Sequence, residues 1–275
     1  EKDGALWLKT KEMGDEKDKV LVKKDGTYAY ITPDIAYHQD KCNREFDLIF
    51  TFLGADHQGQ IPKLIAAMKA LGNDTDKFHF IVAQWMRLVR GGKLVKLSKR
   101  KGVVWGPQDL LNEIGYDATR FFMVQHALTS HMDLDLDLAK ERSERNPVYY
   151  VQYAYVRLQS ILRKAKEGGI IEDIGVTVAL TSHPSLTHTT EVDLMKMMYR
   201  LPDVLYGISQ TYAVHQLPYY AYDLAKAVHV FYKYVPVLAG ENKEVVESRL
   251  QLVLAAKHVL GTTLDILGIS KPDVM

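Results

Sequence analysis

Hydrophobic positions in the first third of the chain fall into short runs that suit buried β-strands. Two β-prone runs flank an Asp-Gly dipeptide within residues 20–31, which predicts a β-hairpin. The Thr-Pro-Asp sequence at residues 32–34 predicts a helix start, with the threonine as its cap. Apolar runs at residues 46–53 and 78–83 predict two buried strands, joined by a helix over residues 60–71. This order of strand, helix and strand predicts a parallel sheet of the Rossmann type.

The pattern of apolar positions changes from about residue 107 onward. The segments that follow have helical spacing, and we expect no strand after residue 138. Long helical stretches cover residues 140–166, 191–212, 218–238 and 242–266. These stretches predict an all-α bundle that follows the α/β region.

The composition adds few constraints to this picture. The 275 residues are 47% hydrophobic and 25% charged, which is enough for two ordinary domains with sizeable cores. The formal net charge is only +1, so any affinity for nucleic acid must come from local patches. Cys42 is the only cysteine, which rules out an intramolecular disulfide and favours a reducing, cytoplasmic setting. Because no run approaches about 18 uninterrupted apolar residues, we expect no membrane partner.

A basic segment at residues 96–100 (Lys-Leu-Ser-Lys-Arg) is the first candidate for chemistry. It is bracketed by glycines, and residues 86–102 contain seven Lys or Arg and no Asp or Glu. Such segments are often only solvated surface. Alternatively, Lys96 and Lys99 could close over a triphosphate and stabilise the charge that builds on a leaving pyrophosphate. The segment alone does not decide between these interpretations.

Residues 28–38 (Tyr-Ala-Tyr-Ile-Thr-Pro-Asp-Ile-Ala-Tyr-His) form the second candidate. In the simpler interpretation they are a strand followed by a capped helix. In the functional one, the Asp34 carboxylate accepts a bidentate pair of hydrogen bonds from a planar guanidinium, and Tyr30 bonds the same group. The predicted position favours the functional interpretation, because α/β sheets bind ligands where strands end and helices begin.

The third candidate lies where the helical region begins. Three aspartates alternate with apolar residues over 132–138, and we favour an extended connector with an acidic face over a metal site. A tyrosine-rich stretch follows at residues 146–155, and residues 140–166 hold seven Lys or Arg against two Glu. Aromatic rings beside cations suit single-stranded RNA, whose bases stack while its phosphates meet the cations. The alternative is that these tyrosines fill the bundle core.

In order and spacing, these segments resemble the arginyl-tRNA synthetase family over essentially the whole chain. Residues 96–100 resemble the KMSKS motif of class I synthetases, with leucine for the methionine and arginine for the final serine. Residues 28–38 resemble the arginine-specific motif of this family, and residues 54–59 (Gly-Ala-Asp-His-Gln-Gly) resemble its next active-site segment. Residues 146–155 resemble the start of its anticodon-binding domain.

The resemblance implies a fold and an activity. Residues 1–138 would be the C-terminal half of a Rossmann-type class I catalytic domain, and residues 139–275 an all-α anticodon-binding domain. The implied activity is that of an arginine–tRNA ligase, which activates arginine with ATP and transfers it to tRNA-Arg. Mg²⁺ would enter with the substrate phosphates rather than at a protein metal site. The full-length enzyme would be a cytoplasmic monomer, and activation would need tRNA.

The resemblance also assigns roles to residues. The catalytic residues would be Lys96, Ser98 and Lys99. The arginine substrate would contact Tyr30, Asp34 and Asp56. ATP would contact Gly54 and His57 together with Lys96 and Lys99. The tRNA would contact Tyr150, Tyr153, Tyr232 and the last residue, Met275. We expect the histidines on helical segments to be packed or capping rather than catalytic; they are His126, His215, His229 and His258.

One expected motif is missing from the sequence. Class I synthetases carry a His-x-Gly-His signature, and none of the ten histidines forms it; residues 57–60 (His-Gln-Gly-Gln) come nearest. We therefore expect this chain to be part of a longer enzyme and to be inactive alone. One alternative is a tRNA-binding module without chemistry. Another is a different nucleotidyl-transferring α/β enzyme, which would not need the tyrosine-rich helices.

Overall fold

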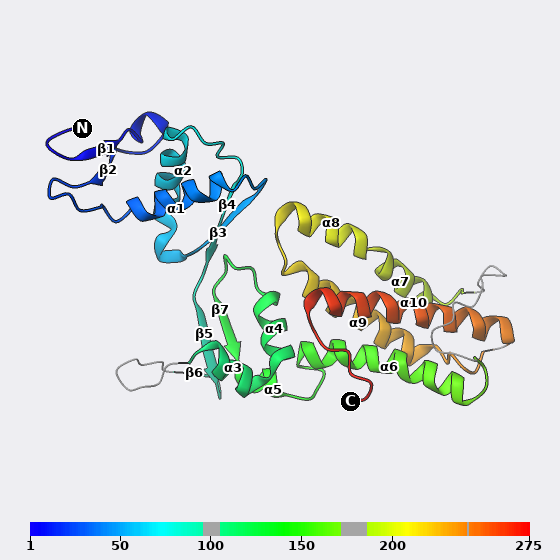
Figure 1. Ribbon diagram of the computed structural model, residues 1–275. Coiled ribbons are helices and arrows are strands. Elements are labelled where there is room, and N and C mark those ends of the chain that lie inside the picture. Colours follow the sequence, from blue (N-terminus) through cyan, green and yellow to red (C-terminus); the bar gives the residue numbers. More distant parts are fainter. Residues whose placement is uncertain (96–104, 172–185, 241) are drawn as a thin grey trace. The chain divides into compact units, whose positions relative to one another are not determined.

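The computed structural model describes residues 1–95, 105–171, 186–240 and 242–275 (Figure 1). These residues form two compact units. The N-terminal unit contains residues 1–86 and 128–132, and the C-terminal unit contains residues 87–127 and 133–275. These units are defined by contacts between residues and do not test the predicted domain boundary after residue 138, which stays a prediction.

A pair of antiparallel strands opens the N-terminal unit. Strand β1 (Leu6–Leu8) pairs with β2 (Lys19–Val22), and a short 3-10 helix, η1 (Lys11–Met13), lies between them. The predicted hairpin is therefore only half correct. Its first run is β2, but the run after the Asp-Gly turn contributes a single bridge, between Val22 and Tyr28, and no strand.

Helix α1 (Thr32–Asn43) begins where the sequence predicted, with Pro33 in its first turn. Thr32, however, is not its cap. Ile31 occupies the cap position, and the Thr32 hydroxyl donates a hydrogen bond to the Leu21 carbonyl at 2.7 Å. Because Thr32 already lies inside the helix, its side chain ties α1 to β2 instead of closing the helix end.

The predicted strand–helix–strand unit is confirmed. Strand β3 (Ile49–Gly54) is followed by the 3-10 helix η2 (Ala55–Gln60), helix α2 (Ile61–Ala70) and strand β4 (Phe78–Ala83). Strands β3 and β4 pair in parallel along their whole length. A small core of Ile35, Leu64, Ala67 and Met68 joins α1 to α2, and both helices lie beside β3 and β4 in Figure 1.

A small sheet, whose residues belong mostly to the C-terminal unit, was not predicted from the sequence. Its strand order is β6 (Lys93–Leu94), β5 (Met86–Arg90) and β7 (Met132–Asp135), and helices α3 (Pro107–Ile114) and α4 (Tyr116–Gln125) precede β7. The predicted connector over residues 132–138 is extended only as far as Asp135. Helix α5 (Leu136–Lys140) then begins, because the Asp135 carboxylate accepts hydrogen bonds from the first backbone N–H groups of the helix.

The predicted helical bundle is confirmed, with corrections to its boundaries. Its helices are α6 (Pro147–Glu167), α7 (Thr189–Tyr199), α8 (Leu201–Thr211), α9 (Gln216–Tyr234) and α10 (Lys243–Leu267). The stretch predicted to start at residue 140 starts at Pro147, since Asn146 caps α6. The predicted helix over residues 191–212 is two helices, because Pro202 lies in the first turn of α8 and cannot continue α7.

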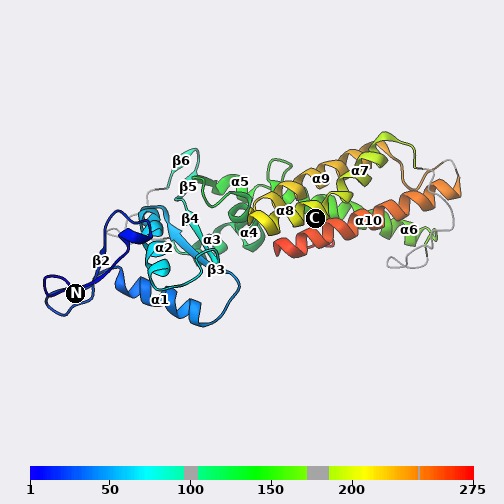
Figure 2. The ribbon, with the colours of Figure 1, turned by 90° about the horizontal axis from the view of Figure 1, so that it is seen from above.

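Helices α6, α7, α9 and α10 enclose the bundle core and run side by side in Figure 2. Leu158, Leu194, Leu224, Phe231 and Leu260 are completely buried there. Helix α10 has the length and mean hydropathy of a membrane-spanning helix, but half of its apolar window is buried in the bundle. Its apolar composition therefore has an explanation in core packing.

Candidate functional site

Tyr30 and Asp34 lie at the start of α1. The Tyr30 side chain is 77% exposed, and Asp34 lies in the first turn of the helix, where the helix dipole favours a carboxylate. Among the described residues, the Asp34 carboxylate has no hydrogen bond or ion pair. Both groups are therefore available to a cationic ligand such as a guanidinium.

A polar network beneath this helix start was not predicted. His38 Nδ1 donates to the Asp34 carbonyl at 2.7 Å, and the Thr51 hydroxyl donates to His38 Nε2 at 3.1 Å. The Lys41 ammonium in turn donates to the Thr51 hydroxyl at 3.0 Å. Burial lowers the pKa of both His38 and Lys41. The network joins the second and third turns of α1 to β3, and a threonine within an apolar strand was the only sequence signal for it.

A second group lies at the carboxyl end of β3. It consists of Asp56, predicted to contact the arginine substrate, and of Gly54 and His57, predicted to contact ATP. Asp56 and His57 lie in η2, and His57 Nε2 is 3.6 Å from Asp56 Oδ2. Gln60 donates to His57 Nδ1 at 2.9 Å, which orients the ring. A Cβ atom at Gly54 would lie 2.6 Å from Asp56 Oδ1, so the glycine leaves room for this carboxylate. The carboxyl end of a parallel strand is where such sheets bind ligands.

In the C-terminal unit, α6 and α9 bring together three side chains that we call the aromatic–arginine group. They are Tyr153, Arg157 and Tyr232. The guanidinium carbon of Arg157 is 4.4 Å from the ring centre of Tyr153 and 4.8 Å from that of Tyr232. Tyr232 remains 40% exposed. Arg157 was counted among the seven cations of residues 140–166 but was not singled out as a site residue, although its position one helical turn after Tyr153 was a signal.

Tyr150 packs between α6 and α9, next to this group. Its ring centre is 4.9 Å from Tyr222 and 4.4 Å from His229. Arg157 donates to His229 Nδ1 at 2.9 Å, and His229 Nε2 donates to the Tyr150 carbonyl at 3.0 Å. These bonds require a neutral imidazole, in agreement with burial and the nearby Arg157 lowering the pKa of His229. His229 is therefore packed, as expected, and it holds Arg157 in place.

A cavity of about 640 Å³, here called the tail pocket, adjoins the aromatic–arginine group. Its walls include Tyr116, Lys140, Arg142, Tyr149, Gln152 and Met275. The ring of Tyr149 stacks on that of Tyr153 with centres 5.9 Å apart, which makes the pocket continuous with the group. Tyr150, Tyr153, Tyr232 and Met275, separated in sequence, are thus brought into one region.

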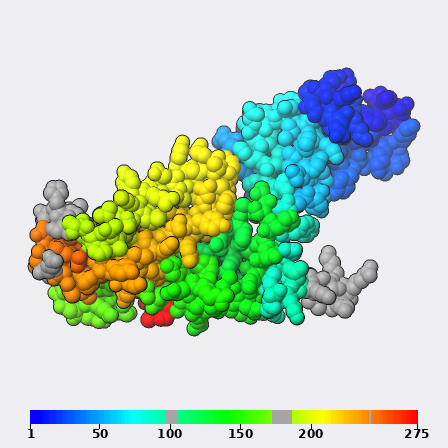
Figure 3. Space-filling model, turned by 180° about the vertical axis from the view of Figure 1, so that it is seen from behind, coloured from blue at the N-terminus to red at the C-terminus, as the bar shows by residue number. Residues whose placement is uncertain are grey.

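Hydrogen bonds hold the C-terminal tail at the pocket. The Asp117 carboxylate accepts from the Ser270 backbone N–H at 3.0 Å, from the Ser270 hydroxyl, and from Gln152 at 2.8 Å. Seen from behind in Figure 3, the red tail lies against the green of α6. Ser270 is thereby anchored to both α4 and α6, and the tail beyond it lines the pocket as far as Met275.

Comparisons with known proteins agree with this geometry. Residues 1–133 match the family described as tRNA synthetases class I (R), catalytic domain, and residues 151–275 match the DALR anticodon binding domain. The arginine–tRNA ligase of Oceanobacillus iheyensis is 41% identical over all 275 residues, which are 49% of its own length. The chain belongs to the arginyl-tRNA synthetase family.

Solved structures support the same fold. A crystal structure from Campylobacter jejuni assigned to the arginyl-tRNA synthetases matches with a TM-score of 0.82 and 30% identity, over 100% of this chain and 58% of that one. Thermus thermophilus arginyl-tRNA synthetase matches with a TM-score of 0.76 at 21% identity, over 99% of this chain and 54% of that one, which shows the fold alone. The chain spans about half the length of the curated relatives it matches.

The predicted fold class is therefore confirmed: part of a class I catalytic domain followed by the anticodon-binding domain of arginyl-tRNA synthetases. The predicted catalytic residues Lys96, Ser98 and Lys99 lie outside the described residues. The two groups of the N-terminal unit come from different elements, and no hydrogen bond or ion pair joins Asp34 to Asp56 among the residues described. Their roles, like those of the tyrosines, stay predictions.

Proposed function

We propose that the protein to which this chain belongs is an arginine–tRNA ligase, and that this chain supplies part of its arginine site and the surface for the anticodon arm. Membership of the arginyl-tRNA synthetase family supports the proposal. The observation that carries it is the continuous surface from the tail pocket, through Tyr149 and Tyr153, to Arg157 and Tyr232.

In the activation step, the arginine carboxylate attacks the α-phosphate of ATP, which gives arginyl-adenylate and pyrophosphate. Asp34 and Tyr30 select the guanidinium of the substrate. A neutral side chain of similar shape would leave the Asp34 carboxylate unpaired, and this cost rejects it. Lys96 and Lys99 stabilise the leaving pyrophosphate. The phosphates of ATP are the Mg²⁺ donors in this proposal.

In the transfer step, a terminal ribose hydroxyl of tRNA takes the arginyl group while the helical bundle holds the anticodon arm. An unstacked base lies on the exposed ring of Tyr232, Tyr153 and Arg157 support that ring, and phosphates meet the nearby cations. Arg157 is fixed by His229, so little side-chain freedom is lost when RNA binds. The tail pocket is large enough to accept a splayed nucleotide.

RNA binding by the chain itself tests the proposal. We expect tRNA-Arg to bind more tightly than a non-cognate tRNA in fluorescence anisotropy, with an affinity that falls steeply as salt rises. Replacing Tyr153 by alanine removes the ring against which Tyr149 and Arg157 pack, and it should weaken tRNA-Arg binding by up to about 5- to 100-fold, the range for losing one stacked base. Tyr153→Phe, which keeps the ring, should bind nearly as the unchanged chain does.

A matched control is Tyr199→Ala, because Tyr199 is an 85% exposed tyrosine of α7 outside the aromatic–arginine group. It should leave the affinity unchanged. Equal weakening by Tyr153→Ala and Tyr199→Ala, or no binding of either tRNA, would contradict the proposed surface.

The chain alone should bind RNA without performing chemistry. It lacks the His-x-Gly-His motif whose side chains act with the lysines on the ATP phosphates. We expect no arginine-dependent exchange of pyrophosphate into ATP by the purified chain. Turnover that follows the chain through purification, free of host enzyme, would show that this division of roles is wrong.

A further inference from the structure

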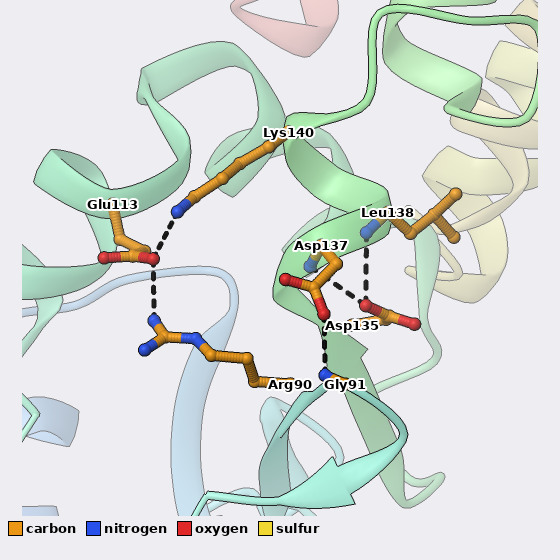
Figure 4. A network of polar contacts seen from close by, with 7 residues as sticks. All are labelled: Arg90, Gly91, Glu113, Asp135, Asp137, Leu138 and Lys140. Atoms are coloured by element: carbon orange, nitrogen blue, oxygen red, sulfur yellow. Dashed lines mark hydrogen bonds and ion pairs between the residues drawn. The ribbon is translucent and has the colours of Figure 1, made fainter.

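One carboxylate in the C-terminal unit lies between two cations from different elements (Figure 4). Glu113 of α3 accepts a hydrogen bond from Arg90, at the end of β5, with 2.6 Å between Arg90 Nη2 and Glu113 Oε1. The same Oε1 atom accepts from the Lys140 ammonium, at the end of α5. This arrangement, with the bond from Lys140 as its main cause, holds the pKa of Glu113 below its usual value.

Through Arg90, the Glu113 carboxylate is connected to the residues that flank segment 96–104. Strand β5 turns into β6 at Gly91 and Gly92, both of which have positive φ, and β6 leads into the segment. The Gly91 N–H donates to the Asp137 carboxylate at 2.6 Å, which fixes the turn to α5. Trp105 is the first described residue after the segment, and its ring centre is 5.6 Å from the guanidinium carbon of Arg90. Arg90 thus links the two flanks.

Through Lys140, the Glu113 carboxylate is also connected to the tail pocket. Lys140 is part of the pocket wall and is at the same time bonded to Glu113. Ile114, the residue after Glu113, also lines the pocket. An RNA phosphate in the pocket would attract the Lys140 ammonium and compete with Glu113 for it.

We propose that Glu113 is a positioning residue that couples occupancy of the tail pocket by RNA to the placement of Arg90 and Trp105. The inference rests on the proposed function, since RNA is the ligand. When Lys140 turns to a phosphate, Glu113 retains Arg90 as its only cationic partner in this network. The guanidinium then reorients to pair with both carboxylate oxygens, which changes its contact with Trp105. The ion pairs of Glu113 with Arg90 and with Lys140 are exposed. We therefore expect the coupling to change the affinity for RNA by a factor of only about two to five.

Trp105 itself provides the signal that tests this coupling. The chain has three tryptophans, and replacing Trp7 and Trp85 by phenylalanine leaves Trp105 as the only one. In this background we titrate tRNA-Arg and follow Trp105 emission and RNA anisotropy together. We expect the emission to change with the same midpoint as binding. In Glu113→Gln and in Arg90→Gln the amplitude should fall at least twofold, while the dissociation constant changes by no more than the factor of about two to five of the coupling itself.

The matched control is Arg87→Gln, on the same strand. Arg87 pairs with Asp133 at 2.6 Å and does not belong to the wall of the tail pocket. It should keep the full amplitude, as should Glu113→Asp, which retains the charge. Far-UV circular dichroism confirms that each variant is folded.

Two results overturn the coupling alone. One is RNA binding without a change in Trp105 emission, and the other is an unchanged amplitude in both Glu113→Gln and Arg90→Gln. If anisotropy shows no binding of tRNA-Arg at all, the proposed function fails and the coupling fails with it. Anisotropy therefore distinguishes the failure of the function from the failure of the coupling.

Discussion

The two units of the molecule differ most in how they bury apolar side chains. In the C-terminal bundle, large side chains such as Phe231 and Leu224 are completely buried between helices. In the N-terminal unit, the core that joins α1 to α2 is small, and large apolar side chains remain exposed. Among the latter, Phe46 is 53%, Phe52 64% and Trp85 65% exposed. The bundle therefore gains far more from apolar burial than the N-terminal unit does.

This difference determines how each unit positions its functional groups. In the bundle, Tyr153 and Arg157 project from a long helix whose opposite face is packed, so the core fixes them. In the N-terminal unit, Asp34 lies at the unit's surface, and a polar network through His38 and Thr51 fixes the helix that carries it. A change in packing should thus affect the RNA surface most, whereas a change in protonation should affect both units.

The largest expected effect is loss of a buried ring. Phe231→Ala should lower the free energy of unfolding by about 3–5 kcal/mol, because it removes a fully buried side chain and leaves a cavity. The same substitution at Phe52 should cost less than about 1 kcal/mol, because that ring is mostly in water already. Urea denaturation followed by circular dichroism measures both. Equal losses would contradict the contrast between the units.

Helix caps give a medium effect. Asn146 is buried, accepts from the Val148 N–H, and donates to the Ala139 and Glu141 carbonyls. Asn146→Ala should therefore cost about 2 kcal/mol. Asn242 caps α10 with one bond to Val245, and Asn242→Ala should cost about 1 kcal/mol.

Helix α2 of the N-terminal unit provides a helix start without a side-chain cap bond for comparison, as α8 and α9 do in the bundle. Its cap residue, Gln60, makes no capping bond with its side chain, so Gln60→Ala should be nearly neutral for helix stability. Midpoints of urea unfolding for the three variants provide the measurement. A Gln60→Ala cost as large as that of Asn146→Ala would contradict the assignment of these costs to the side-chain cap bonds.

Protonation should give the smallest effect, and it should occur in both units. Burial lowers the pKa of His38 and of His229 below 6.5, so below that pH the unfolded chain binds protons that the folded chain does not. Their contribution to stability is present above about pH 6.5 and is lost as pH falls through the folded values. His229→Gln, which can keep one donor and one acceptor, should reduce this loss. Urea titrations at about pH 7.5 and about pH 5 compare the variants, and an unchanged pH dependence would contradict the role of His229.

The sequence was sufficient for elements that local patterns specify. The start of α1, the β3–α2–β4 unit and the bundle follow from turn residues and apolar spacing within one segment. Strands β1, β5 and β6 were missed because they are short and are stabilised by pairing with other segments. The division of α7 from α8 was missed because Pro202 fits a first helical turn, so the apolar period continues across it.

The candidate site follows the same rule. Tyr150 and Tyr153 could be proposed because they belong to a tyrosine-rich stretch. The role of Arg157 could not, since it depends on His229, which lies 72 residues away and is brought near only by the packing of α6 on α9. Lys140 both bonds Glu113 and lines the tail pocket, and these two contacts likewise could not be predicted, because they form only when the chain folds.

The apolar character of α10 has a consequence for synthesis and refolding. Outside the bundle, this helix would present a stretch long and apolar enough to attract a membrane insertion machinery or a chaperone. Helices α6, α7 and α9, which cover it, precede it in the chain, so they leave the ribosome first and can receive α10 as it emerges. A chain refolded from denaturant lacks this order, and α10 is then exposed from the start. Aggregation on refolding, rather than on expression, is the hazard that this arrangement creates.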